Sequence, residues 1–367
     1  MTIATPTYSK NIGRRLIKNS WAFAGMVFIV LAIFVALLGY LIAPDNSPFA
    51  DFQTIELQAK NPGYTQLFLK IPEGLPHKIS LPEKIIYGTP VFCRLIPITQ
   101  YKIEGNTLIT QKYVDEDTSV LQLFDINEIT KGHPKDINQL LITKKYLLGT
   151  DVLGRDILSR LIIGTRVSLT VGLIAVLISL LVGIFLGAIA GFYRGRIDAF
   201  VMWLINVTWS IPTLLLVFAL TLLMGKGFWQ IFTAVGLTMW VGVARLVRGQ
   251  VMAIRELEYI EAVRTMGFSD WRIIWKHILP NMLGPLMVIA AGNFASAIII
   301  EAGLSFLGIG IQPPQPSWGL MIKENYNFIL TNRPLLALIP GIAIMLLVLA
   351  FNLLGNGLRD AVDVKNK

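Results

Sequence analysis

Residues 167–192 read VSLTVGLIAVLISLLVGIFLGAIAGF, a run of apolar and small residues that contains no charged side chain. About 20 apolar residues in a helix are enough to cross the roughly 30 Å hydrocarbon core of a bilayer. Gly183, Gly187 and Gly191 fall on one stripe of such a helix, where small residues allow close packing against another helix. This run therefore predicts a packed transmembrane helix.

The composition of the whole chain agrees with a membrane protein. Of its 367 residues 54% are hydrophobic and 15% are charged, and the mean hydropathy is +0.62. An ordinary soluble domain carries about 25% charged residues, so a wholly water-soluble enzyme is disfavoured. With 31 Gly, 18 Pro and no low-complexity run, the chain is also neither collagen-like nor disordered.

Charge-free runs long enough to span a bilayer occur six times in the chain. They are Asn19–Pro44, Val167–Phe192, Ala199–Gly225, Gly227–Ala244, Ile278–Ile300 and Pro334–Leu358. A further uncharged run, Ala302–Ile322, contains QPPQP at 312–316, and this density of proline predicts a loop on the membrane surface. The first span is too long for the apolar part of a signal peptide, so we expect it to be retained as an anchor.

Lysine and arginine are distributed unequally between the short loops that join these spans. If the N-terminus is cytoplasmic, its side of the membrane carries fifteen of them and the other side three. Positively charged loops remain in the cytoplasm, so we expect both termini inside. The same distribution explains the net charge of +9 without a basic patch for nucleic acid.

The stretch between the first two spans has the composition of a soluble domain. Residues 45–150 hold 11 Lys or Arg and 12 Asp or Glu, a net charge of −1. Within it, Ile98–Val114 alternates on either side of Glu104-Gly105-Asn106, which predicts a β-hairpin. We expect a small strand-rich domain outside the cytoplasm, with a solvated spacer as the alternative.

Few residues resemble a catalytic or cofactor site. Cys93 is the single cysteine, and the three histidines lie far apart without a metal-binding spacing. Gly149 and Gly154 approach the spacing of a phosphate-binding loop, but Arg155 and Asp156 replace the Lys and Ser/Thr that such a loop needs. We expect no catalytic residue, no metal site and no cofactor in this chain.

The largest cytoplasmic loop, residues 245–276, has the pattern of two short amphipathic helices, Ala253–Met266 and Asp270–His277, separated at Gly267. Glycine suits the left-handed conformation that ends many helices, and the polar residues after it suit the next N-cap. A short helix on the membrane face, bent sharply before the chain re-enters the bilayer, is suited to docking another protein. An ordinary solvated loop is the alternative.

The loop contains Glu261-Ala262 and Gly267, and Leu279-Pro280 begins twelve residues after the glycine. This pattern resembles the EAA loop of ABC-importer permeases. In that family the loop forms a coupling helix in a cleft of the ATP-binding subunit, which implies that these residues couple the chain to ATP hydrolysis elsewhere. Val263 stands where the family has a second alanine, and HILPN at 277–281 is typical of its peptide branch.

Two further stretches resemble the dipeptide, oligopeptide and nickel permeases of this family. One is GTDVLGRDILSRLIIGTRVSL at 149–169, and the other is EAGLSFLG at 301–308 followed by PPQPSWG at 313–319. With the EAA loop they cover about residues 149–360 and imply the second permease subunit of an importer. The implied partners are a second homologous permease, two cytoplasmic ATP-binding subunits that hold ATP and magnesium, and an extracytoplasmic substrate-binding protein.

Polar residues in or near the spans are candidates for the translocation pathway or its gate. They are Asn206, Ser210, Asn293 and Glu301. Hydrogen bonds between helices explain the Asn and Ser side chains equally well. Glu301 falls about 30 Å beyond the cytoplasmic start of its helix, near the outer face, where it is either a partnered gate residue or a residue at the water interface.

We therefore predict an all-α integral membrane permease of the bacterial cytoplasmic (inner) membrane, with six transmembrane helices and an extracytoplasmic insert. The predicted segments are a cytoplasmic amphipathic segment 1–18, the first transmembrane helix 19–44, the insert 45–148, the permease core 149–360 and a cytoplasmic tail 361–367. The predicted function is half of an ATP-driven import pathway for peptides, with nickel or another small cargo as the alternative.

Two rival functions make different demands on the sequence. A secondary transporter that works alone predicts buried charged pairs and inverted repeats, whereas the six spans are free of charge. A membrane-anchored enzyme predicts a catalytic constellation within 44–148, where His77, His133, Cys93 and scattered acids are available. The sequence does not identify the cargo.

Overall fold

The computed structural model describes residues 13–73, 79–130, 140–225, 227–331 and 333–362. The chain divides into two compact units, one built from 1–33, 167–312 and 341–367 and the other from 34–166 and 313–340. We call them the helical unit and the sheet unit. Predictions for residues 1–12, His77, His133, Lys226 and the tail after Val362 lie outside the described residues.

Five helical stretches of the described chain are long and apolar enough to cross a membrane. They are α2 (Ser20–Ile42), α5 (Ile157–Tyr193), α8 (Phe228–Arg255), the continuous stretch Asp270–Phe306 and α13 (Leu335–Val362). The broken pair α6 and α7 makes a sixth if it counts as one span. The chain is thus mostly helical, and each predicted span falls on one of these stretches.

The predicted span Ala199–Gly225 is wrong as a single straight helix. Helix α6 (Gly195–Trp209) and helix α7 (Thr213–Met224) meet at an angle of 92°. Pro212 stands immediately before α7 and lacks the N–H that would continue the hydrogen-bond ladder of α6. A proline near the middle of an apolar run therefore breaks the helix without changing its hydropathy.

Two helices extend well beyond their predicted charge-free limits. Helix α5 begins at Ile157 instead of Val167, and α8 continues past Ala244 to Arg255. Arginine is a good helix former, so a charged residue ends the apolar run without ending the helix. The absence of charge therefore predicts which part of a helix can cross the hydrocarbon core. It does not predict where the helix ends.

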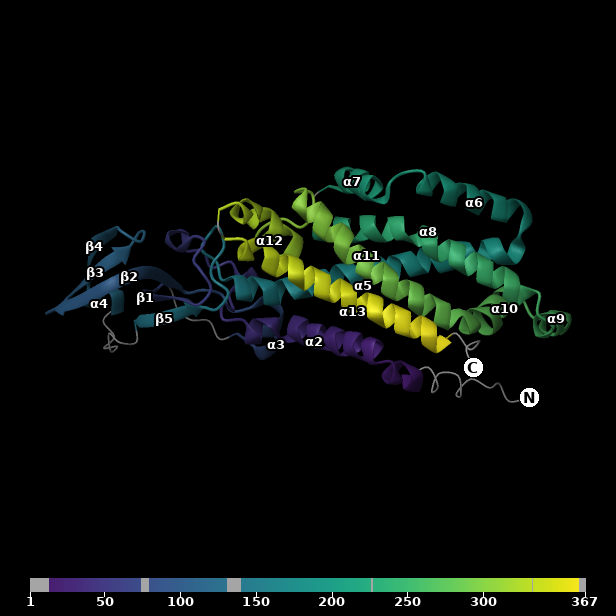
Figure 1. Cartoon of the computed structure of the whole chain (residues 1–367), viewed down its shortest axis with the longest axis horizontal. Helices are drawn as coiled ribbons and strands as arrows, with labels where there is room; N and C mark the ends of the chain where they lie inside the picture. The colour runs from purple at the N-terminus through teal and green to yellow at the C-terminus, as the bar shows by residue number, and fades with distance from the viewer. Residues whose placement is uncertain (1–12, 74–78, 131–139, 226, 332, 363–367) are drawn as a thin grey trace. The chain divides into compact units, whose positions relative to one another are not determined.

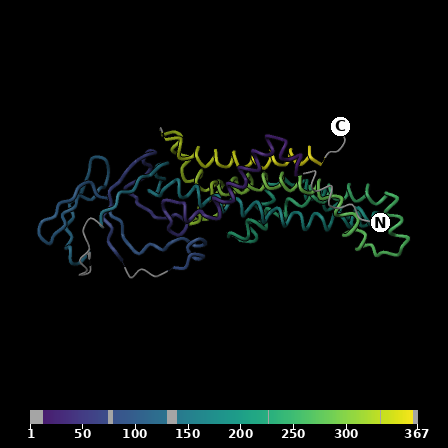
Figure 2. Tube along the Cα trace, turned by 90° about the horizontal axis from the view of Figure 1, so that it is seen from below, coloured from purple at the N-terminus to yellow at the C-terminus, as the bar shows by residue number. Residues whose placement is uncertain are grey.

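Close packing of helices in the helical unit depends on glycine. A Cβ atom on Gly183, Gly187 or Gly191 would lie only 2.4–2.7 Å from atoms of α8, which confirms the predicted packing stripe. Helix α2 lies beside α13 in both views (Figures 1 and 2), and a Cβ on Gly25 would lie 2.6 Å from the Ala350 carbonyl oxygen. The backbones of these helices come close together because glycine has no side chain to hold them apart.

The sheet unit contains a five-stranded antiparallel sheet with strand order β4-β3-β2-β1-β5 (Figure 1). The strands are β1 (Tyr64–Pro72), β2 (Cys93–Glu104), β3 (Thr107–Tyr113), β4 (Ser119–Asp125) and β5 (Leu141–Tyr146). Glu104 pairs with Thr107, and Gly105 has φ +59° in the two-residue turn between them. The predicted hairpin is therefore confirmed.

Short helices complete the fold. They are a helical segment at 13–18, η1 (Pro48–Ala50), η2 (Ile55–Leu57), α3 (Leu81–Tyr87), α4 (Ile126–Thr130), α12 (Trp318–Asn325) and η6 (Tyr326–Ile329). The predicted surface loop Ala302–Ile322 is correct only between the end of α11 (Leu283–Phe306) and Ser317. Ser317 accepts a hydrogen bond from the Leu320 N–H and caps α12, so the chain becomes helical again directly after the prolines.

Candidate coupling loop and pathway residues

The predicted amphipathic helix Ala253–Met266 is two helices in the structure. Helix α8 continues to Arg255, and the separate helix α9 comprises Glu258–Thr265. Leu257 between them has extended backbone angles, with φ −79° and ψ 138°. The predicted helix therefore begins too early, because its first residues belong to the end of α8.

Helix α9 is held by its apolar face. Ile260 and Val263 are 1% and 8% exposed and belong to one cluster with buried residues of the segment that follows. These buried residues of the following segment are Ile273, Ile274, Ile278 and Met282. Val263, which departs from the family pattern, is thus a core residue of the loop, whereas Glu261 and Ala262 on the remaining face are exposed.

Gly267 has φ +79°, the left-handed conformation expected where α9 ends. A Cβ at this position would meet no atom within 4 Å, so only the backbone angle demands glycine here. Ser269 takes the N-cap position of the next helix, without a side-chain hydrogen bond. The predicted break at Gly267 is confirmed.

The predicted second helix Asp270–His277 is wrong as a separate element. Helix α10 (Asp270–Ile273), a π-turn η4 (Ile274–Ile278) and a 3-10 turn η5 (Leu279–Met282) lead into α11 as one continuous stretch. Pro280 stands in the first turn of η5, where a missing N–H costs little. The changes of helix type accommodate the proline without redirecting the chain.

A hydrogen-bond network fixes α9 against this stretch. The Asn281 side-chain amide donates to the Tyr259 hydroxyl at 3.1 Å and to the His277 carbonyl at 2.7 Å. The Tyr259 hydroxyl in turn lies 3.4 Å from the same carbonyl. Burial raises the pKa of Tyr259, so its hydroxyl stays protonated and can donate. Two residues of the HILPN sequence therefore have a structural role in the loop.

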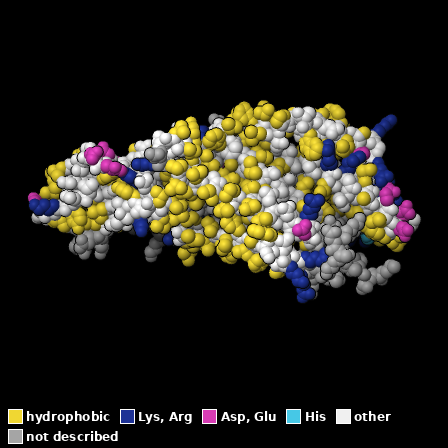
Figure 3. Space-filling view, viewed as in Figure 1, with side chains coloured by type: hydrophobic (Ala, Val, Ile, Leu, Met, Phe, Trp, Pro, Cys, Tyr) yellow, Lys and Arg dark blue, Asp and Glu magenta, His cyan; other side chains and the backbone are white. Residues whose placement is uncertain are grey.

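The face of α9 that points away from this cluster, which we call its outward face, is not covered by described residues. Glu261 forms no hydrogen bond or ion pair with the described residues, and Leu257 and Met266 at the two ends of the helix are 47% and 65% exposed. Figure 3 shows charged side chains gathered near this end of the helical unit, whereas apolar side chains cover its long helices. An apolar, partly acidic face on a rigidly held helix is suited to protein docking.

Two of the predicted pathway residues lie at the break between α6 and α7. Asn206 is exposed, and its side-chain oxygen lies 3.5 Å from a guanidinium nitrogen of Arg245. That guanidinium stacks on Trp209, 3.8 Å from the ring centroid. The Ser210 hydroxyl instead donates to the Val207 carbonyl of its own helix at 2.7 Å. The structure thus brings Asn206 together with a cation that the sequence had assigned to a loop.

The other two candidates are engaged inside the helical unit. The Asn293 side-chain amide donates to the Ser179 hydroxyl at 3.3 Å, which joins α11 to α5. Glu301 is 1% exposed and accepts a hydrogen bond from the Ser305 hydroxyl at 2.6 Å. Ser305 also accepts from the Ile311 N–H. Glu301 is therefore partnered and buried in this chain.

The family-like sequence at 149–160 folds as a tight turn in the sheet unit. Gly149 and Gly154 have φ +82° and +72°, and a Cβ on Gly154 would lie 1.7 Å from the Thr54 carbonyl oxygen. The Asp151 carboxylate accepts from the N–H groups of Leu153 and Arg155 at 2.9 and 3.0 Å. Both glycines therefore allow the backbone of this turn to approach a neighbouring carbonyl closely.

A cluster of buried charged side chains lies at and directly after that turn. Arg155 and Arg160 are each 1% exposed. Arg155 donates to Asp151 at 2.7 Å, to Asp51 at 3.0 Å and to Glu324 at 2.7 Å, and Arg160 lies 3.1 Å from the same Glu324 oxygen. Neighbouring carboxylates raise the pKa of Arg155 against the effect of burial. The cluster ties three separate segments of the sheet unit together.

The tryptophan of the PPQPSWG stretch packs on the first turns of α5. The Trp318 indole N–H donates to the Leu161 carbonyl at 3.0 Å, and a Cβ on Gly164 would lie 2.9 Å from its ring. The two stretches that resemble peptide permeases are therefore in direct contact. Spacing alone gave no signal for this pairing, nor for the contact of Glu324 with Arg155, because the partners are about 160 residues apart in sequence.

Comparison with known families gives two matches. A family described as binding-protein-dependent transport system inner membrane component matches residues 183–367. A second family, the N-terminal TM domain of oligopeptide transport permease C, matches residues 7–59. Residues 60–182, which include all five strands, lie outside both ranges.

Individual relatives are similar over more than half of the chain. The glutathione transport system permease protein GsiD of Pectobacterium atrosepticum is 44% identical over 222 residues, 60% of this chain and 73% of that protein. The dipeptide transport system permease protein DppC of Bacillus subtilis is 45% identical over 220 residues, 60% and 69% of the two chains. A solved inward-facing conformation of the MetNI methionine ABC transporter covers 55% of this chain and 96% of its own, at 20% identity and a TM-score of 0.46.

Proposed function

The chain belongs to the family of binding-protein-dependent transport system inner membrane components, and from this premise we propose that it forms half of the pathway of an ATP-driven peptide importer. It is a multi-pass protein of the inner membrane and a transport component, not an enzyme. The proposed partners are a second permease, two cytoplasmic ATP-binding subunits that hold ATP and magnesium, and an extracytoplasmic binding protein.

The observation that carries the coupling role is the outward face of α9. Its apolar face is buried against Ile273 and Ile274, so a force applied to α9 is transmitted to the helical stretch that continues into α11. Glu261 has no partner among the described residues and can pair with a basic side chain of an ATP-binding subunit. Ala262 leaves room for close approach, and Gly267 and Leu279-Pro280 set the path of the chain after α9.

The proposed cargo is a peptide, in agreement with the glutathione, dipeptide and oligopeptide permeases to which the chain is similar. Arg245 supports this cargo class, because its exposed guanidinium beside Asn206 can bind a peptide carboxylate. Ser210, Asn293 and Glu301 are engaged within the chain, so we assign them to shaping the pathway.

The coupling role is tested by two variants and a matched control. Glu261→Ala removes a charge-assisted contact and should weaken binding of the ATP-binding subunits about tenfold to a hundredfold. Gly267→Ala places a Cβ at positive φ and should displace the docking face. Gly249→Ala is the control, because Gly249 lies in α8, is exposed and has open space for a Cβ.

The measurements are co-purification of the ATP-binding subunits and the stimulation of their ATPase activity by cargo. Both should fall in the two loop variants and remain normal in Gly249→Ala, with all three proteins inserted in the membrane. Normal assembly and normal transport by the double variant at 261 and 267 would refute the coupling role.

The proposed orientation has both termini and α9 in the cytoplasm and the sheet outside. Lys102 in the sheet has a 73% exposed side chain, and Glu261 on α9 is also exposed. In a Cys93→Ser background, Lys102→Cys should react with a membrane-impermeant thiol reagent in spheroplasts, and Glu261→Cys only after permeabilisation. The reverse pattern would invert the topology.

A further inference from the structure

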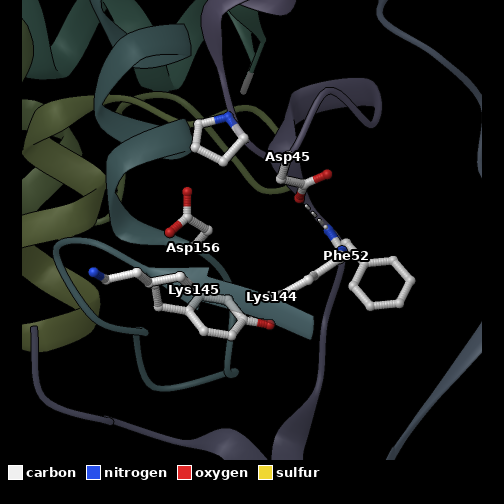
Figure 4. Close-up of a pocket in the computed structure, with 7 residues that line it drawn as sticks. Asp45, Phe52, Lys144, Lys145 and Asp156 are labelled. Atoms are coloured by element: carbon white, nitrogen blue, oxygen red, sulfur yellow. Dashed lines mark hydrogen bonds between the residues drawn. The ribbon is translucent and has the colours of Figure 1, made fainter. Parts of the chain in front are cut away.

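A cavity of about 160 Å³ lies in the sheet unit, and none of its lining residues belongs to the coupling loop or to the helix break. It is lined by Pro44, Asp45, Phe52, Lys144, Lys145, Tyr146 and Asp156 (Figure 4). These residues come from the segment after α2, from strand β5 and from the position that precedes α5. Two carboxylates and two lysines therefore meet in one space.

Asp156 has an unused hydrogen-bonding position in this cavity. The residue is 5% exposed, and one carboxylate oxygen accepts from the Ser159 N–H at 2.8 Å and from the Ser159 hydroxyl. The other oxygen, Oδ1, is buried and has no hydrogen-bond donor among the described residues. A buried carboxylate oxygen without a donor costs free energy, which a ligand N–H would recover.

Lys144 offers the opposite charge, and no carboxylate of the described residues lies within ion-pair distance of its ammonium; Asp45 and Asp156 act on it only from farther away. Its ammonium lies over the rings of Phe52 at 4.7 Å and Phe68 at 5.9 Å and forms no hydrogen bond or ion pair with the described residues. Desolvation lowers the pKa of Lys144 and raises that of Asp156, so a ligand group of opposite charge would stabilise the charged form of each. Asp45, by contrast, already accepts from the N–H groups of Ser47 and Phe52 at 3.0 and 3.3 Å.

We propose that this cavity binds a small zwitterion of the α-amino acid class, with its ammonium on Asp156 and its carboxylate on Lys144. Each ligand charge meets a protein group of opposite charge that lacks such a partner among the described residues. A cavity of about this volume holds a molecule of about six heavy atoms, which matches glycine or alanine. The site is independent of the proposed transport role, because none of its residues belongs to the coupling loop or to the pathway candidates.

The test is equilibrium dialysis of radiolabelled glycine and L-alanine against the full chain purified in detergent. Asp156→Asn keeps the shape of the side chain and removes its charge, and Lys144→Gln removes the cation. Each should weaken glycine binding about tenfold to a hundredfold. Lys102→Gln, a substitution on the exposed hairpin, is the control and should bind as the wild type does.

Ligand analogues separate the two halves of the site. Methylamine should compete with glycine in Lys144→Gln but not in Asp156→Asn, and L-tryptophan should compete poorly because it exceeds the cavity. The proposal is overturned if glycine at millimolar concentration does not bind the wild type, or if either variant binds it with unchanged affinity. No ATP-binding subunit is present in this assay, so its outcome does not depend on the coupling role.

Discussion

The Asn281 side-chain amide lies 3.1 Å from the Tyr259 hydroxyl and thereby joins α9 to the helical stretch that leads into α11. Asn281 also binds the His277 carbonyl, so one side chain fixes both the position of α9 and a carbonyl within the π-turn. The candidate coupling loop is consequently a braced element and not a free connector. Its rigidity is what the proposed coupling requires, since a loose helix would absorb the movement of a partner.

We expect Tyr259→Phe to uncouple transport partially from ATP hydrolysis without unfolding the coupling loop. The substitution keeps the ring and removes the hydroxyl that Asn281 and the His277 carbonyl share, which costs about 1 kcal/mol. Transport per ATP hydrolysed should fall while the loop stays folded. Tyr101→Phe is a control on an exposed tyrosine of strand β2. Unchanged transport stoichiometry in Tyr259→Phe would show that the brace is dispensable.

Gly154→Ala should prevent correct folding of the sheet unit. Its Cβ would lie 1.7 Å from the Thr54 carbonyl oxygen, at a backbone φ of +72° that already disfavours alanine. Gly105→Ala shares the positive φ but has open space, so it should cost only about 1 kcal/mol. Both variants carry the backbone strain, but only Gly154→Ala carries the steric clash. The difference between them in membrane yield and thermal stability therefore measures the effect of the clash. Equal yields would contradict the close backbone contact.

Glu324→Gln should destabilise the sheet unit strongly. Glu324 accepts from both Arg155 and Arg160, and it is the one hydrogen-bond acceptor of Arg160 among the described residues. Its neutralisation weakens these charge-assisted hydrogen bonds, which typically contribute about 1.5–3 kcal/mol, although Asp51 and Asp151 remain beside both arginines. The exposed pair Lys102–Glu104 is the matched comparison, and Glu104→Gln should have little effect. Thermal unfolding of the detergent-purified chain measures both. A small effect of Glu324→Gln would mean that other groups neutralise the cluster.

The two asparagines named as pathway candidates should respond differently. Asn293→Ala removes a hydrogen bond between α11 and α5 and should lower stability by about 1 kcal/mol. Asn206→Ala affects an exposed contact with Arg245 and should leave stability unchanged while altering peptide uptake. Measuring the midpoint of thermal unfolding and the uptake rate for each variant tests this division. Loss of stability in Asn206→Ala alone would reverse it.

Asp156 should make stability depend on pH. Desolvation raises its pKa in the folded state, so its protonated form is favoured there. The contribution of protonated Asp156 to the free energy of unfolding is fully present below its pKa in the unfolded chain, about 3.9. This contribution is lost as pH rises through the pKa in the folded state. Asp156→Asn should therefore raise the midpoint of thermal unfolding near pH 7, and the gain should shrink toward about pH 4. A gain that is constant with pH would contradict the assignment.

The sequence by itself determined the membrane class, the number of apolar runs and the left-handed break at Gly267. Hydropathy and charge act on each segment separately, so Val167–Phe192 predicts a span without knowledge of its neighbours. The hairpin around Gly105 and the glycine stripe on α5 were predictable for the same reason: turn chemistry and small-residue periodicity are local properties.

Tertiary structure alone decided how distant residues meet. Helix α8 extends through Arg245 to Arg255, and the position of α6 beside it places Arg245 on Trp209 instead of in a loop. The burial of Glu301, the contact of Arg155 with Glu324 and the cavity around Asp156 likewise join segments far apart in the chain. Such pairings depend on the packing of whole elements, and residue spacing within one segment carries no information about them.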